Sequence, residues 1–397
     1  MSDDLLKELL DKPVGPAIKG RKTNPERDFT RQVEVSGEAA TVTIRGSEKE
    51  TTEDIAAAQL WAEGLDPAEW MVTGYRTSEW TMPSGETGVS RRFTYVHAPT
   101  PAQSDRPDLD ELLARVNLHE PVASRPEGDH GFLVLLGDMQ FGKIDGDGVE
   151  GTLRRTLGCL DRAADRLLMY SEQFPIGHVH LGWLGDHIEG FVSQGGANVW
   201  RTPLTLNEQI RLTRRTMLYA LELFAPLADR VSMAAVPGNH GEAVRFAGKG
   251  VTRYDDSHDT ESLIAVADAA RLNPGAFGHV EFYVPETDEL TVVTEVAGTV
   301  VAHAHGHQWR PGKHFEWWRG QAFNRESAMH QADLLVAGHL HHEFIDTDGP
   351  RTFIQPPSME SESTWWKHAK GTVGAPGLIV AVTKDGETNI KEVVRSE

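Results

Sequence analysis

The chain of 397 residues contains a single cysteine, Cys159, so it can form no internal disulfide. Its longest apolar runs, around residues 132–136 and 378–382, are far shorter than the roughly 20 residues that cross a bilayer. The N-terminus is acidic and amphipathic and lacks the positively charged start of a signal peptide. No internal repeat or low-complexity segment is present. These absences predict a globular cytoplasmic protein that does not enter the membrane.

Positive charge is also scarce. Lysine and arginine total 39 against 59 aspartates and glutamates, which gives a net charge of −20. A field of this sign repels polyphosphates at long range, so the composition gives no support for nonspecific coating of nucleic acid. A local basic groove stays open, and two divalent ions would offset about four negative charges where they bind. The composition therefore leaves the partner undecided.

The patterns along the chain divide it into four regions. A small α/β module is predicted from a strand at 40–45, a helix at 52–63 and a hairpin whose strands surround a PSGETG turn. The segment after it is rich in Pro, Asp and Arg, which is typical of a linker. The predicted regions are an N-terminal helix and basic arm (1–39), the module (40–97), the linker (98–129) and a C-terminal domain (130–397).

The C-terminal domain alternates buried strands with amphipathic helices. FLVLLGD is typical of a buried strand, and an apolar stripe predicts the helix that follows it. Further strands are expected at HVHLGWLGD, VSMAAVPGNH, HVEFYV, LTVVTEV, TVVAHAHGH, DLLVAGHLHH, near Phe353 and at GLIVAVT. The helices are expected at 152–174, 204–228, 259–271 and about 314–331.

Five short polar segments follow these predicted strands. They are GDMQ (137–140), GDHIEG (185–190), GNH (238–240), HGH (305–307) and GHLH (338–341). In a layered α/β fold, ligand sites lie beyond the carboxyl ends of strands, so all five segments can converge. Carboxylate, amide and imidazole groups without thiolate suit Mn²⁺, Fe, Zn²⁺ or Ni²⁺ in preference to a structural zinc site. Each segment alone is a weak signal, but the ordered set predicts a metal centre.

The order of these segments resembles that of the calcineurin-like metallophosphoesterases, a superfamily that includes repair exonucleases. The resemblance covers residues from about 131 to the C-terminal strands. It implies an α+β fold in which a two-sheet β-sandwich is flanked by helices in four layers. It also implies two divalent ions, with Mn²⁺ the leading candidate. One ion would be held by Asp138, Gln140 and His341 and the other by Asn239, His305 and His339, with Asp186 bridging them.

The resemblance also implies a role for His240, which would face the scissile phosphate as a general acid or charge stabiliser. Two ions about 3.5–4 Å apart activate water and clamp the phosphoryl oxygens, so no protein nucleophile is needed. Arg245 is a candidate for holding a nonbridging phosphate oxygen, with a surface ion pair as the alternative.

One residue departs from the superfamily pattern. Gln140 stands where a histidine is usual, and a neutral amide is a weaker ligand, so the first ion would be held loosely or be supplemented by His187. His303, His305 and His307 share a strand face by the period of two, and we expect one to bind metal and the others to orient it.

The leading functional hypothesis is a hydrolase of phosphodiesters in DNA or RNA, with the N-terminal module selecting the substrate. A phosphodiesterase or phosphatase for small nucleotides or phosphoproteins is the alternative enzyme. A non-catalytic scaffold of the same fold is a third hypothesis, against which His240 speaks. The sequence leaves the substrate, the metal and the oligomeric state open.

Overall fold

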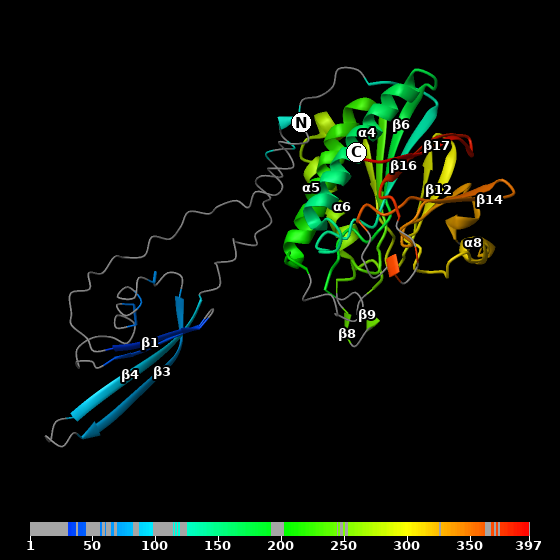
Figure 1. The fold of residues 1–397 in the computed structure, drawn as a ribbon. Helices are drawn as coiled ribbons and strands as arrows, with labels where there is room; N and C mark the ends of the chain where they lie inside the picture. Colours follow the sequence, from blue (N-terminus) through cyan, green and yellow to red (C-terminus); the bar gives the residue numbers. More distant parts are fainter. Residues whose placement is uncertain are drawn as a thin grey trace. The chain divides into compact units, whose positions relative to one another are not determined.

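Figure 1 shows the fold in a computed structural model of the protein. The described residues are 31–36, 39–44, 70–81, 87–97, 125–191, 202–243, 245–246, 249–250, 253–324, 327–361 and 374–396, with a few isolated positions between them. Residues 12–106 form one compact unit, and residues 107–397 lie in a second. The finer domain boundaries expected from the sequence stay predictions.

The N-terminal unit contains an antiparallel sheet of four strands in the order β1-β2-β4-β3. These strands are β1 (Arg31–Ser36), β2 (Ala39–Ile44), β3 (Trp70–Thr81) and β4 (Thr87–His97). The predicted hairpin is therefore present, whereas β1 falls in the segment predicted to be an arm. The alternate residues Phe93 and Tyr95 are buried in a small core with Ala56, Leu60 and Trp70. Of the predicted helix at 52–63, only residues 56, 57 and 60 are described, and all three are helical.

The first sheet of the C-terminal unit has six strands in the order β10-β7-β6-β5-β16-β17. These are β5 (His130–Leu136), β6 (Ile176–Trp183), β7 (Arg230–Ala235), β10 (Val280–Tyr283), β16 (Leu378–Lys384) and β17 (Glu387–Val394). The four strands from β10 to β5 are parallel, and β16 and β17 continue the sheet in antiparallel fashion. Parallel strands need long crossovers, which here contain the helices.

The second sheet has five strands in the order β11-β12-β13-β15-β14. These are β11 (Val292–Val296), β12 (Thr299–His303), β13 (Leu334–Val336), β14 (Phe344–Asp348) and β15 (Arg351–Gln355). The strands β12, β13 and β15 are parallel, and β11 and β14 pair antiparallel at the edges. The sequence patterns did not predict β14 or β17.

The two sheets pack face to face, and helices cover their outer faces (Figure 1). Within β5, Phe132 and Val134 face the helices, whereas Leu133 and Leu135 face the second sheet. Three helices cover the six-stranded sheet: α4 (Gly148–Ser171), α5 (Leu206–Phe224) and α6 (His258–Ala270). One helix, α8 (His314–Phe323), packs on the five-stranded sheet through Trp318. The structure confirms the predicted α+β fold with four layers.

The expected helix over 314–331 is wrong in its length. The backbone becomes extended at Asn324, which ends α8 one residue earlier, and a separate turn of 3₁₀-helix follows at Ala328–His330. The indole N–H of Trp318 donates to the carbonyl of Met329 over 3.1 Å, which fixes this turn against α8. The helix α5 begins with a capping box between Thr205 and Glu208. The short elements are α7 (Pro274–Phe277), β8 (Arg245–Phe246), β9 (Lys249–Gly250) and the 3₁₀-turn Ala225–Leu227.

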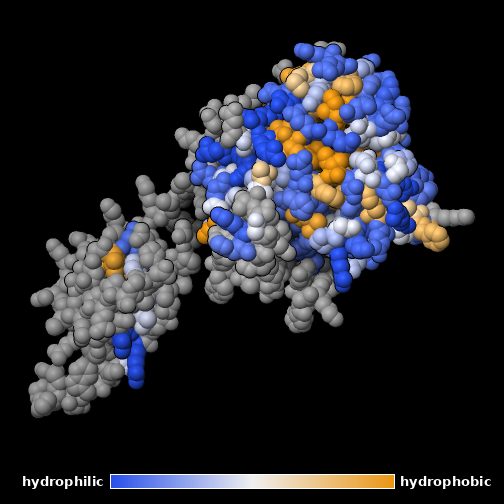
Figure 2. Space-filling model, turned by 45° about the vertical axis from the view of Figure 1, so that its right-hand side comes forward, coloured by the Kyte–Doolittle hydropathy of each residue, from blue (hydrophilic) through white to orange (hydrophobic). Residues whose placement is uncertain are grey.

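Among the described residues, no helix is both long and apolar enough to cross a membrane. The visible face of the C-terminal unit is mainly hydrophilic, with apolar residues in a band across its middle (Figure 2). Cys159 lies on the buried face of α4 and is part of the core, as a lone structural thiol would be.

Candidate metal centre

The five predicted segments follow the carboxyl ends of five parallel strands. GDMQ follows β5, GDHIEG follows β6, GNH follows β7, HGH follows β12 and GHLH follows β13. Because the two sheets face each other with these strand ends at one edge, segments more than 200 residues apart in sequence lie in contact. The N–H of His339, for example, donates to Oδ2 of Asp138 over 2.8 Å.

Left-handed backbone is concentrated in these segments. Among the described residues other than glycine, eight have a positive φ, and five of the eight are predicted site residues. The five are Asp138, Gln140, Asp186, His339 and His341. Such conformations cost on the order of 1–3 kcal/mol each and persist only where surrounding contacts hold them, most often at functional sites.

Close backbone approach explains the glycines that precede the ligands. A Cβ on Gly238 would lie 2.0 Å from Oδ1 of Asp186, and one on Gly338 would lie 2.7 Å from Oδ2 of Asp138. No side chain larger than hydrogen fits at either position. The loops after β5 and β6 are also joined by backbone hydrogen bonds, from Asp138 to Gly185, from Gln140 to Asp186 and from Phe141 to His187.

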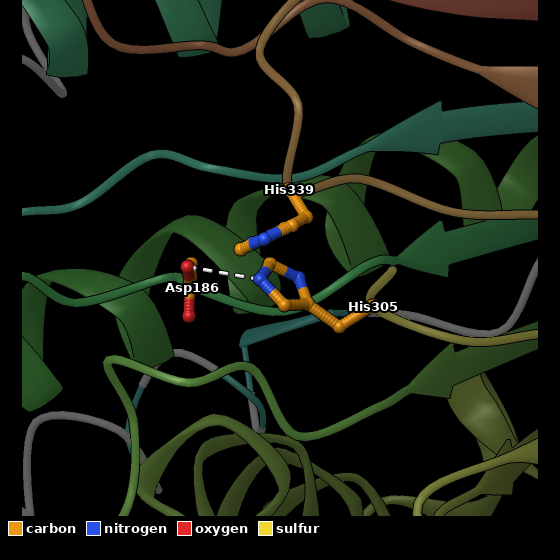
Figure 3. A group of neighbouring side chains, drawn as sticks. All are labelled: Asp186, His305 and His339. Atoms are coloured by element: carbon orange, nitrogen blue, oxygen red, sulfur yellow. Dashed lines mark ion pairs between the residues drawn. The ribbon is translucent and has the colours of Figure 1, made fainter. Parts of the chain in front are cut away.

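One group of three side chains has the geometry of a metal site. Ligand atoms of Asp186, His305 and His339 all lie within 4.8 Å of one another, and Asp186 and His305 are fully buried. Figure 3 shows the three side chains pointing toward one another, with Oδ2 of Asp186 2.9 Å from Nε2 of His305. Two ligands of one ion, each about 2.0–2.2 Å from it, are separated by about this distance. This donor set fits a divalent cation.

The second nitrogen of His305 is held by the backbone. Its Nδ1–H donates to the carbonyl of Leu184 over 2.7 Å, which leaves Nε2 facing Asp186. Burial alone would lower the pKa of His305, but Asp186 outweighs this effect and raises the pKa to about 9. His339 has no carboxylate in such close contact, and burial together with the charge of His305 lowers its pKa to about 4.

A second half of the centre forms around Asp138. Its Oδ1 is 3.4 Å from Nε2 of His341, and the Nδ1 of His341 is 2.9 Å from the buried carboxylate of Glu360. Among the described residues, Oδ1 of Asp138 has no hydrogen-bond partner. Burial opposes protonation of His341, but Asp138 and Glu360 raise its pKa to about 10. Carboxylates at this density need a cation nearby.

Gln140 lies at the same half of the centre, but its amide oxygen accepts a hydrogen bond from Nζ of Lys143 over 3.2 Å. Asn239 lies between two residues whose N–H groups bind buried carboxylates, since Gly238 donates to Asp259 and His240 donates to Asp186. The segment 238–240 is thereby held against the centre. Coordination of metal by Gln140 and Asn239 stays a prediction.

His240 lies at the side of the Asp186 group. Its Nε2 is 3.9 Å from Oδ2 of Asp186. Its Nδ1 is 3.1 Å from the carbonyl oxygen and 3.3 Å from the carboxylate of Glu189. Burial by itself would lower the pKa of His240, but Asp186 and Glu189 raise the pKa to about 9. A histidine held in this way carries a proton that its Nε2 can present toward the centre.

Two other candidates lie outside the centre or outside the described side chains. Nε2 of His187 accepts from the N–H of Gly185 over 3.3 Å, and its Nδ1 is 3.3 Å from Asp259. Because Nδ1 of His187 has no hydrogen-bond partner among the described residues, coordination of the first ion by His187 stays a prediction. Arg245 forms part of β8, but its side chain is not among those described.

Of the three alternating histidines, only His305 enters the metal group. His303 instead joins a buried chain of polar groups between the two sheets, formed by His178, Ser232, His180 and His303. The chain runs from His178 Nε2 to Ser232 Oγ, to His180 Nδ1, and from His180 Nε2 to His303 Nε2, each over 2.8 Å. The expectation that His303 orients His305 is therefore not met by a side-chain hydrogen bond between the two.

The carbonyl of Val292 fixes the protons of this chain. It lies 3.1 Å from His303 Nδ1 and can only accept, so Nδ1 carries the proton and Nε2 of neutral His303 accepts from His180. His180 Nδ1 then accepts from Ser232, which accepts from His178. All three rings are neutral in this arrangement. Burial lowers the pKa of His178 and of His303 to about 4 and that of His180 well below its usual value.

Four residues of the centre were not predicted from the sequence. They are Lys143, Glu189, Asp259 and Glu360. Asp259, in the first turn of α6, is fully buried and accepts from the N–H groups of Asp186, His187 and Gly238. Glu189 lies within the GDHIEG segment and could have been considered. The other three lie outside the segments, and no local pattern identifies them.

No protein-family model and no curated protein matches this chain. Similar solved structures include a predicted phosphoesterase from Streptococcus pneumoniae, an archaeal phosphodiesterase and Vacuolar Protein Sorting 29 from Cryptosporidium parvum. Their sequence identities to this chain are 14%, 11% and 16%, and their TM-scores are 0.28, 0.31 and 0.30. They cover 67%, 66% and 68% of this chain, and 98%, 99% and 99% of their own lengths. The function has to come from the geometry of the site.

Proposed function

We propose that this protein is a metal-dependent hydrolase of phosphoester bonds. The observation that carries the proposal is the group formed by Asp186, His305 and His339, together with His240 at its side. A divalent ion bound there would activate water and polarise a phosphoryl oxygen. The group lies at an edge where two sheets end, as ligand sites of layered α/β proteins do.

Each residue of the group has a distinct role in this proposal. Asp186, His305 and His339 hold the ion, and the hydrogen bond to Leu184 orients His305 for that purpose. His240 stabilises the charge that develops on the phosphoryl group or protonates the leaving oxygen, and Glu189 keeps it protonated and oriented. Asp259 holds the loops that carry Asp186 and Gly238.

The pairing of His240 with Glu189 favours an enzyme over a scaffold. A scaffold needs no buried, protonated histidine beside a metal-binding group, and burying these charges is costly. The competing enzyme hypothesis is hydrolysis of small nucleotides or phosphoproteins. It uses the same metal centre, and it differs only in the residues around the centre that would bind the substrate.

Two arginines of the N-terminal unit favour nucleic acid as the substrate. Arg76 on β3 and Arg92 on β4 are direct cross-strand partners, and both are exposed. Like charges in this position destabilise a sheet unless an anion lies between them. In the strand register, Arg92 pairs with Thr43, and Thr43 pairs with Gln32. Of the N-terminal helix and basic arm predicted for residues 1–39, only residues 31–36 and 39 are described.

The proposed activity is tested by turnover of bis-p-nitrophenyl phosphate with Mn²⁺, with a chelated sample as control. We expect metal-dependent release of nitrophenol. Turnover that is equal with and without metal, or absent with every divalent ion tried, would contradict the proposal.

The substrate class is tested by binding of single- and double-stranded DNA and RNA at several salt concentrations. Each lost phosphate contact reduces the salt slope by about 0.7–0.9. Replacing Arg76 and Arg92 together by Ala should remove about two phosphate contacts and make the salt dependence of binding correspondingly shallower. Turnover of the small diester should be retained. An unchanged slope would favour a small nucleotide.

A further inference from the structure

A lysine lies in the Asp138 half of the centre. Nζ of Lys143 is 2.9 Å from Oε1 of Glu360 and donates to Oε1 of Gln140 over 3.2 Å. The side chain of Lys143 is 18% exposed and that of Glu360 is 2% exposed. Because Glu360 is cut off from water, its charge requires positive charge in contact. The ammonium of Lys143 supplies it, beside Nδ1 of His341 at 2.9 Å from the same oxygen.

Local structure directs Lys143 to this place. Its N–H donates to the carbonyl of Gln140 over 3.0 Å, which closes a tight turn. Gly142 within the turn has a φ of +114°, and a Cβ there would lie 2.5 Å from the side chain of Gln209. On the opposite side, the N–H of Glu360 donates to the carbonyl of Asp138 over 3.1 Å. Both partners of the ion pair are thus fixed beside Asp138.

The two halves of the centre therefore differ in charge. The hydrogen bonds and ion pairs of Asp186, His305 and His339 involve no lysine or arginine among the described residues. In the Asp138 half, the amide oxygen of Gln140, which is predicted to bind the first ion, accepts a hydrogen bond from the ammonium of Lys143. The ammonium of Lys143 would repel a divalent cation placed beside it. The cation would also have to share the amide oxygen of Gln140 with this ammonium.

We propose that Lys143 supplies the second positive charge of the centre in place of a second metal ion. The centre then binds one divalent ion per chain, in the Asp186 half. The ammonium of Lys143 neutralises Glu360 and offers its remaining N–H group to a phosphoryl oxygen. This inference rests on the proposed function, and it replaces the expectation of two ions.

The test is the metal content of the protein after loading with excess Mn²⁺ and removal of unbound metal. Wild type is expected to retain one equivalent per chain. Lys143→Met removes the charge with little change of length and is expected to retain two equivalents. Lys143→Arg keeps the charge and should stay at one equivalent. Lys313→Met serves as a matched control, because Lys313 pairs with Glu316 at the surface of α8 and should not affect metal content.

A second measurement uses wild type alone and does not depend on the folding of a variant. Electron paramagnetic resonance of the Mn²⁺-loaded protein should show isolated ions, without the exchange coupling of a pair. Two equivalents in wild type, a coupled spectrum, or a folded Lys143→Met protein that still holds one equivalent would each overturn the inference. Two ions with normal turnover would leave the proposed function standing. A wild-type protein that binds no metal and has no turnover would overturn both proposals.

Discussion

Two groups of buried histidines in this protein have pKa values shifted in opposite directions. The centre histidines, His240, His305 and His341, each have a carboxylate oxygen within 3.4 Å, and their pKa values are raised to about 9 or 10. Among the described residues, the sandwich histidines His178, His180 and His303 form side-chain hydrogen bonds to hydroxyl, imidazole and carbonyl groups only, and their pKa values are lowered. All six side chains are largely removed from water. Burial alone therefore does not decide the charge of a histidine; the nearest carboxylate does.

The largest effect is expected from removing the carboxylate that serves the centre histidines. Asp186→Asn should abolish turnover and release most of the bound metal, because Oδ2 of Asp186 faces His305 and Oδ1 holds the backbone of His240. Metal analysis and the diester assay measure both effects, and circular dichroism checks the fold. Asp346→Asn is a matched control, since Asp346 pairs with His314 over 3.0 Å away from the centre. An Asp186→Asn protein that keeps its metal and its activity would remove Asp186 from the site.

A smaller and separable loss is expected from His240. His240→Asn should lower kcat by roughly 10²–10⁴-fold, the usual scale for acid–base catalysis, because the proton presented at Nε2 is lost. The metal content should stay near that of wild type, since Asp186, His305 and His339 are unchanged. Loss of metal together with activity would instead identify His240 as a ligand.

The sandwich histidines should make the protein sensitive to acid. Their folded pKa values lie below the unfolded value of about 6.5, so the unfolded chain binds protons first as the pH falls. The stability is therefore fully present above about pH 6.5 and decreases down to about pH 4. Each such histidine contributes up to about 1.4 kcal/mol per pH unit in this window.

His178→Gln tests this effect, because Gln can still donate to Ser232 but does not titrate. The slope of the unfolding free energy between pH 6.5 and 4 should become shallower by up to one proton, as measured by urea denaturation. His330→Gln, at an exposed histidine, should leave the slope unchanged. A wild-type protein whose stability does not fall over this range would show that the sandwich histidines are not held neutral.

The smallest effect is expected from adding a histidine to the centre. Gln140→His restores the residue usual in the resembling superfamily, but Lys143 still occupies that half, so metal content should stay at one equivalent. The double variant Gln140→His with Lys143→Met should bind a second ion and shift preference toward Zn²⁺, because imidazole is a softer ligand than an amide. Calorimetric titration with both metals measures this. A second ion in the single variant would show that residue 140, and not Lys143, limits the occupancy.

Much of the fold could be predicted from local sequence. The continuous apolar run of the FLVLL segment predicted a buried strand, and the apolar stripe of residues 152–174 predicted a helix that is observed over Gly148–Ser171. Two errors came from long-range contacts. The helix after His314 stops at Phe323, since the chain turns back so that Met329 meets Trp318. The edge strand β14 has exposed residues on both sides, and most of β17 is only partly buried, so neither sequence forms a strongly apolar pattern.

The sequence by itself determined where the polar segments lie, because strands and the glycine turns that end them are set by local periodicity and backbone freedom. Only the tertiary structure decided which histidines join the centre. HVH at 178–180 and HAH at 303–305 have the same spacing, yet three of these rings are drawn into the sandwich and only His305 reaches Asp186. Tertiary structure also brought Lys143, Glu189, Asp259 and Glu360 to the site. Their roles depend on charges buried by packing two sheets together, and no local pattern records which charges will meet.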